Sequence, residues 1–287
     1  MAVEVTSESR SCGGCGQSLQ SRRCGTCDAK PPSLFNEWQY ALELSQLYWD
    51  PVYYGWGVPR GDGAPILLIP GFLAGDLSMA VLGEWLRRTG YAVYYPGIWT
   101  NTDCPDRMVL QIRDLIARIT EQHGRRIIVV GHSKGGYLGR VLGQQFPDLI
   151  RHVIALGSPF NDPLDIHPFT LLLVDLVKLL YRQRGARSSV PHHYGPLCYS
   201  TACQCDFALG LRGGLPTRVR YTAVYSRNDG VVRWRHCLDE VPENNFEVTG
   251  THLGLIFNSQ VFRYLGQLLA QSTREEREEA VGSRSSR

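Results

Sequence analysis

Two apolar patterns alternate along most of the chain. Short runs of consecutive apolar, often β-branched residues predict buried strands, and they recur at 64–70, 91–95, 126–130, 149–156, 218–225 and 246–248. Apolar residues at helical spacing predict helices over 33–49, 77–89, 105–123, 136–147 and from 254 to Leu269. Strands that alternate with helices predict an α/β fold with a mainly parallel sheet, right-handed crossovers and helices on its faces.

The alternation is interrupted between about 160 and 216. A strongly apolar stretch at 169–181 lies there, on the carboxyl side of the sheet, where an inserted helical lid covers an active site. The same pattern is also typical of a buried helix of the fold proper. The aromatic-rich helix at 33–49 is expected to pack on the core, with membrane binding as the alternative. We expect one domain over 33–271 and a disordered, charged tail over 272–287.

The composition is that of a globular domain and excludes several classes of function. Among 287 residues, 43% are hydrophobic and 20% are charged, and the net charge of +3 is too small to indicate nucleic-acid binding. No apolar run is long enough to span a bilayer, and residues 1–10 lack the hydrophobic region of a secretory signal. We therefore expect a cytoplasmic protein without a transmembrane segment.

Cysteine pairs mark residues 1–32 as a separate small segment. Two C-x-x-C knuckles, formed by Cys12 with Cys15 and by Cys24 with Cys27, stand a short loop apart. Four thiolates at this spacing can hold one structural Zn²⁺, and so short a segment needs a metal or a staple to fold. We predict a zinc-ribbon-like knuckle that can recruit a protein partner, with two disulfides or an unfolded tail as alternatives. Five further residues could bind a second metal ion, although small buried thiols and a surface histidine pair are the more common explanation of such a group. They are His192, His193, Cys198, Cys203 and Cys205.

The central chemical signal is the pentapeptide Gly131-His132-Ser133-Lys134-Gly135. It lies between the predicted strand at 126–130 and the predicted helix at 136–147, which is the strand–turn–helix setting of a nucleophile elbow. A serine hydroxyl is a weak nucleophile unless a tight turn presents it to a base, and the glycines allow that turn. We predict Ser133 as the nucleophile, with a glycine-rich loop of another doubly wound protein as the alternative.

Three further loops can supply the rest of a catalytic site. The loop after the first predicted strand can bring the backbone N–H of Phe72 beside that of Lys134, and the two would form an oxyanion hole. Asp229 directly follows the fifth strand, and His252 stands on a glycine-rich loop after the sixth. The order Ser, Asp, His then assigns Asp229 as the orienting acid and His252 as the base. The fallback residues are the acids Asp239, Glu240 and Glu243 and the base His236.

Four segments together resemble one family: 70–76, 131–136, 225–232 and 250–254. They are similar to the lipase/esterase branch of the α/β-hydrolase superfamily, above all to bacterial class-2-lipase-like proteins and their GPI inositol-deacylase-like relatives. The resemblance covers residues 50–270 and implies the α/β-hydrolase fold and a serine esterase that needs no cofactor. The Cys-rich segment is not part of that fold, so the resemblance implies nothing about its role.

The sequence therefore predicts a carboxylic-ester hydrolase that acts on a small hydrophobic ester or a lipid through an acyl-enzyme. Acyl transfer or thioester hydrolysis on the same triad is an alternative, because only the acceptor and the leaving group differ. A non-catalytic zinc-knuckle adaptor built on a hydrolase fold is a second alternative.

Overall fold

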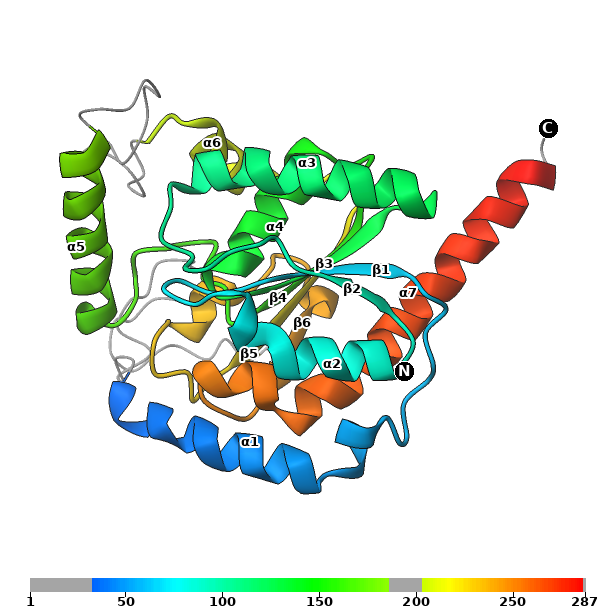
Figure 1. Cartoon of the computed structure of the whole chain (residues 1–287), viewed down its shortest axis with the longest axis horizontal. Helices are drawn as coiled ribbons and strands as arrows, with labels where there is room; N and C mark the ends of the chain where they lie inside the picture. Colours follow the sequence, from blue (N-terminus) through cyan, green and yellow to red (C-terminus); the bar gives the residue numbers. More distant parts are fainter. Residues whose placement is uncertain (1–32, 186–202, 286–287) are drawn as a thin grey trace, which may run out of the picture. The chain divides into compact units, whose positions relative to one another are not determined.

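The computed structural model describes residues 33–185 and 203–285, which form a parallel sheet between two layers of helices (Figure 1). The sheet has six strands in the order β2-β1-β3-β4-β5-β6, and every neighbouring pair is parallel. The strands are β1 (Pro65–Ile69), β2 (Ala92–Tyr94), β3 (Ile127–His132), β4 (Ile150–Leu156), β5 (Arg220–Ser226) and β6 (Asn245–Val248). The predicted parallel sheet flanked by helices is confirmed.

Two hydrophobic cores lie on the opposite faces of the sheet. Successive residues of a strand point to opposite faces, so Ile66 and Leu68 of β1 belong to one core and Leu67 and Ile69 to the other. The central strands β1, β3 and β4 are buried along their whole length, which explains why they appear in the sequence as continuous apolar runs.

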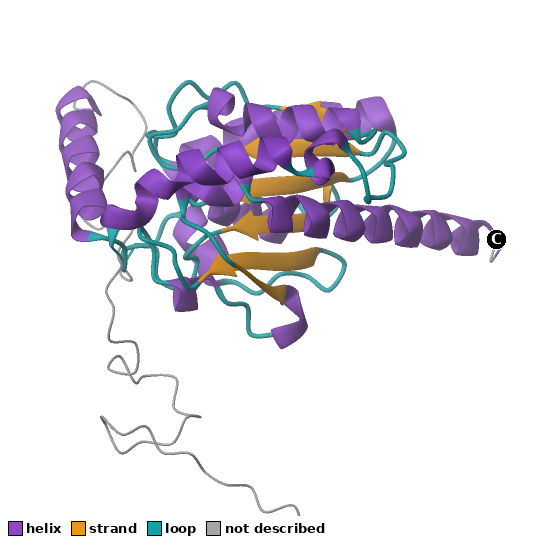
Figure 2. Cartoon of the chain, turned by 90° about the horizontal axis from the view of Figure 1, so that it is seen from below, coloured by secondary structure: helices purple, strands orange, loops and turns teal. Residues whose placement is uncertain are grey.

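The helices are divided between these two faces (Figure 1, Figure 2). One layer contains α3 (Pro105–His123), α4 (Lys134–Gln145) and α6 (Asp206–Arg212). The other contains α1 (Tyr40–Trp49), α2 (Ala80–Arg88) and α7 (Ser259–Ser285). A 3₁₀ helix, η1 (Leu34–Gln39), leads into α1, and α5 (Pro168–Gly185) follows the loop after β4.

The end of the chain differs from the sequence prediction. We predict that the last helix ends at Leu269 and that a disordered tail begins at 272, whereas α7 continues to Ser285. A helix thus stands where the tail is predicted, as far as Ser285, while residues 286–287 lie outside the described ranges. Over 272–276 the side chains of this helix make specific contacts. Ser272 is buried, and a carboxylate oxygen of Glu276 accepts hydrogen bonds from Arg125 at 2.6 Å and from Arg151 at 2.9 Å.

The interruption at 160–216 contains two different kinds of helix. The side chain of Phe207 in α6 is buried against Tyr137 of α4, and the carboxylate of Asp106 accepts a hydrogen bond from its backbone N–H at 2.8 Å. Helix α6 therefore packs on the core. It lies outside the apolar stretch at 169–181, for which a buried helix is the alternative to a lid. Helix α5 instead exposes Phe169, Leu172 and Leu176. Across 33–185 and 203–285, no helix combines the length and the apolar character that crossing a bilayer requires.

Candidate active site

The turn between β3 and α4 has the backbone that a nucleophile elbow requires. Ser133 adopts φ 50° and ψ −119°, an unfavourable left-handed conformation for a residue with a side chain, and its N–H donates to the carbonyl of Leu156 at 2.8 Å. The turn also packs tightly against β1, since a β-carbon at Gly135 would lie 2.1 Å from the carbonyl oxygen of Ile69. Only glycine at 135 therefore lets the helix approach the strand so closely.

A buried histidine–carboxylate pair lies at the carboxyl ends of the neighbouring strands. Nδ1 of His252 lies 2.6 Å from Oδ2 of Asp229, and the two side chains are only 4% and 2% exposed. The other carboxylate oxygen of Asp229 accepts the backbone N–H groups of Val231 at 2.9 Å and Val232 at 2.8 Å. Because the carboxylate accepts, Nδ1 of His252 carries the proton, and its Nε2 keeps a lone pair for a proton transfer.

His252 lies beside the elbow. The imidazole rings of His132 and His252 are 4.8 Å apart between centroids, and Nε2 of His132 donates to the carbonyl of His252 at 2.9 Å. Since Ser133 follows His132 directly, the predicted nucleophile and the predicted base come from loops that touch each other.

The surroundings of the two imidazoles shift their pKa values in opposite directions. Burial favours neutral His252, but the charge and hydrogen bond of Asp229 outweigh it, together with the charge of Glu37, and raise the pKa above the ordinary 6.5. Burial, and secondarily the charge of His252, lowers the pKa of His132 to about 3. His132 thus stays neutral near pH 7, and His252 is the group of the two that can exchange a proton there.

Ser133, Phe72 and Lys134 line one narrow cavity of about 40 Å³. The rest of its wall is mainly apolar and includes Tyr137, Ile166, Val174, Val177, Val231 and Val232. The structure thus brings the two predicted oxyanion-hole residues to the predicted nucleophile. Val231 and Val232, which hold the Asp229 carboxylate, reach the same cavity from the acid loop.

The side chain of Lys134 holds the loop beside the elbow. Its ammonium donates to the carbonyls of Asn101 at 3.3 Å and Asp103 at 2.9 Å, and it lies 6.0 Å from the centroid of the Phe72 ring. The amide of Asn101 donates to the carbonyl of Pro70 at 2.7 Å. The backbone N–H of Asn101 donates to the carbonyl of Ala74 at 2.8 Å, so Asn101 fixes the backbone on either side of Phe72, which an oxyanion donor needs.

The fallback residues lie in other surroundings. Asp239 pairs with Arg140 at 3.5 Å, and His236 pairs with Asp165 at 2.8 Å. In the described ranges, 33–185 and 203–285, no group of three or more His, Cys, Asp or Glu side chains is arranged to hold a metal ion. The predicted zinc ligands Cys12, Cys15, Cys24 and Cys27, and His192, His193 and Cys198 of the further set, lie outside these ranges.

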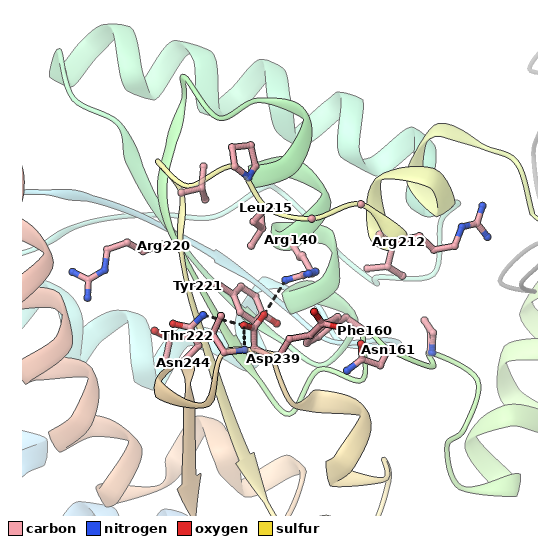
Figure 3. A pocket seen from close by; sticks show the side chains of 18 of the residues that line it. Arg140, Phe160, Asn161, Arg212, Leu215, Arg220, Tyr221, Thr222, Asp239 and Asn244 are labelled. Atoms are coloured by element: carbon pink, nitrogen blue, oxygen red, sulfur yellow. Dashed lines mark hydrogen bonds and ion pairs between the residues drawn. The ribbon is translucent and has the colours of Figure 1, made fainter. Parts of the chain in front are cut away.

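A second, larger cavity of about 1140 Å³ extends along α6 and the start of β5 (Figure 3). Arg140 points toward Asp239 there, and its guanidinium carbon lies 4.2 Å from the centroid of the Phe160 ring and 4.9 Å from that of Tyr221 (Figure 3). Pro163 also lines the narrow cavity at Ser133. The walls carry side chains of both charges, so the cavity does not favour an anionic or a cationic ligand.

Two residues at the site do not emerge from the sequence analysis. Glu37 of η1 and Glu43 of α1 accept hydrogen bonds from the backbone that carries His252. No signal in the sequence distinguishes them, because isolated acids on an amphipathic helix ordinarily face solvent.

Comparisons with known proteins support the same fold. Residues 64–200 match the family model described as the alpha/beta hydrolase fold. The lysosomal thioesterase PPT2 homolog of Drosophila melanogaster is 30% identical over 138 residues, which cover 44% of this chain and 48% of that protein. The chain thus spans about half the length of this curated relative.

Two solved structures share the fold over most of their length. The mature lipase BlEst2 of Bacillus licheniformis matches with a TM-score of 0.52 at 18% identity, covering 77% of this chain and 96% of that one. A structure of the metagenome-derived lipolytic enzymes LipS and LipT also has a TM-score of 0.52, at 17% identity, covering 76% and 96%. At such low identity these likenesses define the architecture alone, and the chemistry must be argued from the site.

Proposed function

This protein is an α/β-hydrolase by fold, and from that premise we propose that it is a serine hydrolase of carboxylic esters with Ser133, His252 and Asp229 as its triad. The observation that carries the proposal is the buried His252–Asp229 pair, 2.6 Å between Nδ1 and Oδ2, on the loop that touches the elbow of Ser133. Its tautomer leaves Nε2 of His252 free to accept the serine proton.

In the acylation step, Oγ of Ser133 attacks the acyl carbon while Nε2 of His252 takes its proton. The carbonyl oxygen becomes an oxyanion, which the backbone N–H groups of Phe72 and Lys134 bind. The tetrahedral intermediate then breaks its bond to the leaving oxygen, which receives the proton from His252. The products of this step are an alcohol and the acyl-Ser133 ester.

Deacylation repeats these steps with water as the nucleophile. His252 takes a proton from the water as its oxygen attacks the acyl-Ser133 carbon, and returns it to Oγ of Ser133 when that bond breaks. Asp229 keeps its negative charge throughout and stabilises the imidazolium. The chemistry thus needs no metal or organic cofactor, and the products are a carboxylic acid and the free enzyme.

The wall of the narrow cavity indicates an apolar acyl group. The cavity volume of about 40 Å³ is far below the roughly 300–1,000 Å³ of typical ligand pockets. Thr170, Val174 and Val177 of α5 close one side of it. We propose that α5 is the lid and that it moves outward to admit a longer acyl chain.

The test is active-site labelling with a fluorophosphonate together with turnover of p-nitrophenyl esters of graded acyl length. We expect Ser133→Ala to abolish both the labelling and the turnover while the circular dichroism spectrum is retained. Ser78→Ala, which removes a hydroxyl outside the elbow, serves as the matched control and should behave like wild type. Full activity of Ser133→Ala would exclude the serine mechanism.

Thioester hydrolysis is the second candidate function. The relative named a lysosomal thioesterase PPT2 homolog favours it, and the same triad would release a thiolate in place of an alkoxide. Parallel assays with matched acyl esters and acyl thioesters rank the two leaving groups. Adding alcohols to compete with water measures acyl transfer. A wild-type protein that neither labels nor turns over any of these substrates would favour the adaptor alternative.

The Cys-rich segment and the location of the protein belong to the proposal as well. We propose that Cys12, Cys15, Cys24 and Cys27 hold one structural Zn²⁺ and that this knuckle binds a protein partner. Metal analysis should find one zinc per wild-type chain and a loss of it in Cys12→Ser. Retention of the full zinc content in that variant would place the metal elsewhere. The proposed cytoplasmic location is tested by cell fractionation with a soluble marker enzyme.

A further inference from the structure

One buried carboxylate links the acid loop to the base loop. Glu37 is only 6% exposed, although it carries a charge and stands near the start of the described chain. Its Oε1 accepts the N–H of Gly230 at 2.9 Å and the N–H of His252 at 3.0 Å, and its Oε2 accepts the N–H of Leu253 at 2.9 Å. Gly230 directly follows Asp229, so the bonds of Glu37 lie next to both members of the His252–Asp229 pair.

The contact is close enough to constrain the sequence of the acid loop. A β-carbon at Gly230 would lie 2.3 Å from the carbonyl oxygen of Ser33 and 2.8 Å from Oε1 of Glu37. The loop therefore packs directly on the segment that carries Glu37, with no space for a side chain between them. Hydrogen bonds from backbone N–H groups to a carboxylate are charge-assisted and stronger than bonds between neutral groups.

We infer that Glu37 is a positioning residue for the proposed catalytic reaction. Its carboxylate holds the Asp229 loop and the His252 loop in their relative positions, and its negative charge stabilises the imidazolium. The inference rests on the proposed function, because it assigns Glu37 a role in that reaction. It adds the η1 segment to the functional site, although this segment precedes the residues that match the family model.

The charges packed around His252 make this role measurable. The titratable groups that face it are Asp229 from the loop after β5, His132 from the end of β3, and Glu37 from η1. Glu43 approaches from α1, packs against Gly254 and accepts hydrogen bonds from the N–H and the hydroxyl of Thr251 at 2.8 Å and 2.9 Å. The charge of Glu37 contributes to raising the pKa of His252, so its removal must lower that pKa.

The test compares Glu37→Gln with the matched control Glu43→Gln in the full chain. Both variants neutralise a glutamate that binds the backbone of the base loop, but only Glu37 also binds the acid loop. We expect Glu37→Gln to lower kcat by up to about 10²-fold, which is the cost of a misplacement of about 1 Å. We also expect it to move the acid inflection of the pH–rate profile downward. Glu43→Gln should leave the inflection where wild type has it.

The pKa of His252 is measured independently of turnover by proton NMR titration, with His252→Gln to assign the resonance. A folded Glu37→Gln with wild-type kcat and an unchanged pKa of His252 would overturn the inference. If Glu37→Gln does not fold, Glu37→Asp replaces it, which keeps the charge but shortens the side chain. That variant should lose kcat with little shift of the inflection, and a wild-type kcat would overturn the positioning role.

Failure of the proposed function gives a different pattern. Wild type would then not label with the fluorophosphonate or turn over any ester or thioester, whatever stands at position 37. The NMR titration would still report on the contact between Glu37 and His252. A lowered pKa in Glu37→Gln would keep the structural link, and its absence would remove the inference as well.

Discussion

Replacing Asp229 by asparagine tests the tautomer on which the mechanism depends. Oδ1 of Asp229 accepts two backbone N–H groups, from Val231 and Val232, while Oδ2 accepts Nδ1–H of His252. An asparagine that keeps its oxygen on the two backbone donors must point its own NH₂ group at Nδ1. Two donors cannot bond, so the imidazole moves its proton to Nε2 and loses the lone pair that would accept the proton of Ser133. The opposite amide orientation leaves both backbone donors without an acceptor.

The size of the effect follows from the burial of the pair. With both side chains no more than 4% exposed, water cannot replace the lost carboxylate. A wrong tautomer in a serine triad costs about 10⁴-fold in kcat, or roughly 5 kcal/mol of the activation barrier. The loss of the negative charge also removes its share in raising the pKa of His252, so any residual activity should persist to lower pH than in wild type.

The assay measures kcat for the best ester or thioester substrate, together with the rate of fluorophosphonate labelling. Asp239→Asn is the matched control, because that carboxylate is also largely buried, 12% exposed, but pairs with Arg140 in the other cavity. We expect the control to keep nearly wild-type rates. A folded Asp229→Asn with kcat within about tenfold of wild type would refute the assignment of Asp229 and of the proton on Nδ1.

Three further predictions follow from other contacts. A general base must be neutral, and the pKa of His252 is raised, so kcat/KM should rise with pH through an inflection above 6.5. A flat profile between pH 5 and 9 would argue against His252 as the base. Glu276→Ala leaves the guanidinium of Arg151, which is 5% exposed, without its carboxylate partner. The free energy of unfolding, measured in urea, should fall by about 3–5 kcal/mol. The control Glu84→Ala removes an exposed ion pair and should change this free energy by less than about 1 kcal/mol. Val174→Phe narrows the cavity at Ser133 and should raise KM for long acyl chains more than for acetyl esters, whereas an equal effect on both would show that α5 does not contact the acyl group.

The sheet and the elbow could be predicted because their signals are local. A buried parallel strand needs several consecutive apolar residues, and β1, β3 and β4 each supply them. The turn at Ser133 needs glycines at fixed offsets between a strand and a helix. Asp229 and His252 could be identified only as residues at the ends of predicted strands, and their contact depends on the topology that brings those ends together.

The remaining features depend on long-range packing that leaves no periodic signal. Residues 272–285 look like a disordered tail because they are charged, yet Arg125 and Arg151 provide partners for Glu276 from distant parts of the chain. Glu37 is one of two isolated acids in the predicted helix at 33–49, and only the folded chain shows that three backbone N–H groups donate to it. Helix α6 lies within the predicted lid but buries Phe207, Gly210 and Leu211, because one face of it packs on the core, where Tyr137 contacts Phe207.

The short edge strand explains why the base loop needs supports from outside the sheet. Strand β6 pairs with β5 over only four residues, Asn245 to Val248. The hydrogen bonds of the sheet therefore hold the loop that carries His252 at only one of its ends. Side chains hold the loop at further points: Ser226 donates to the carbonyl of Gly250 at 2.6 Å, and Glu37 and Glu43 accept the N–H groups of residues 251–253. Through Glu37, the segment η1 thus supports both loops of the proposed triad, so Glu37→Gln should change kcat although Glu37 lies far from Ser133 in the sequence.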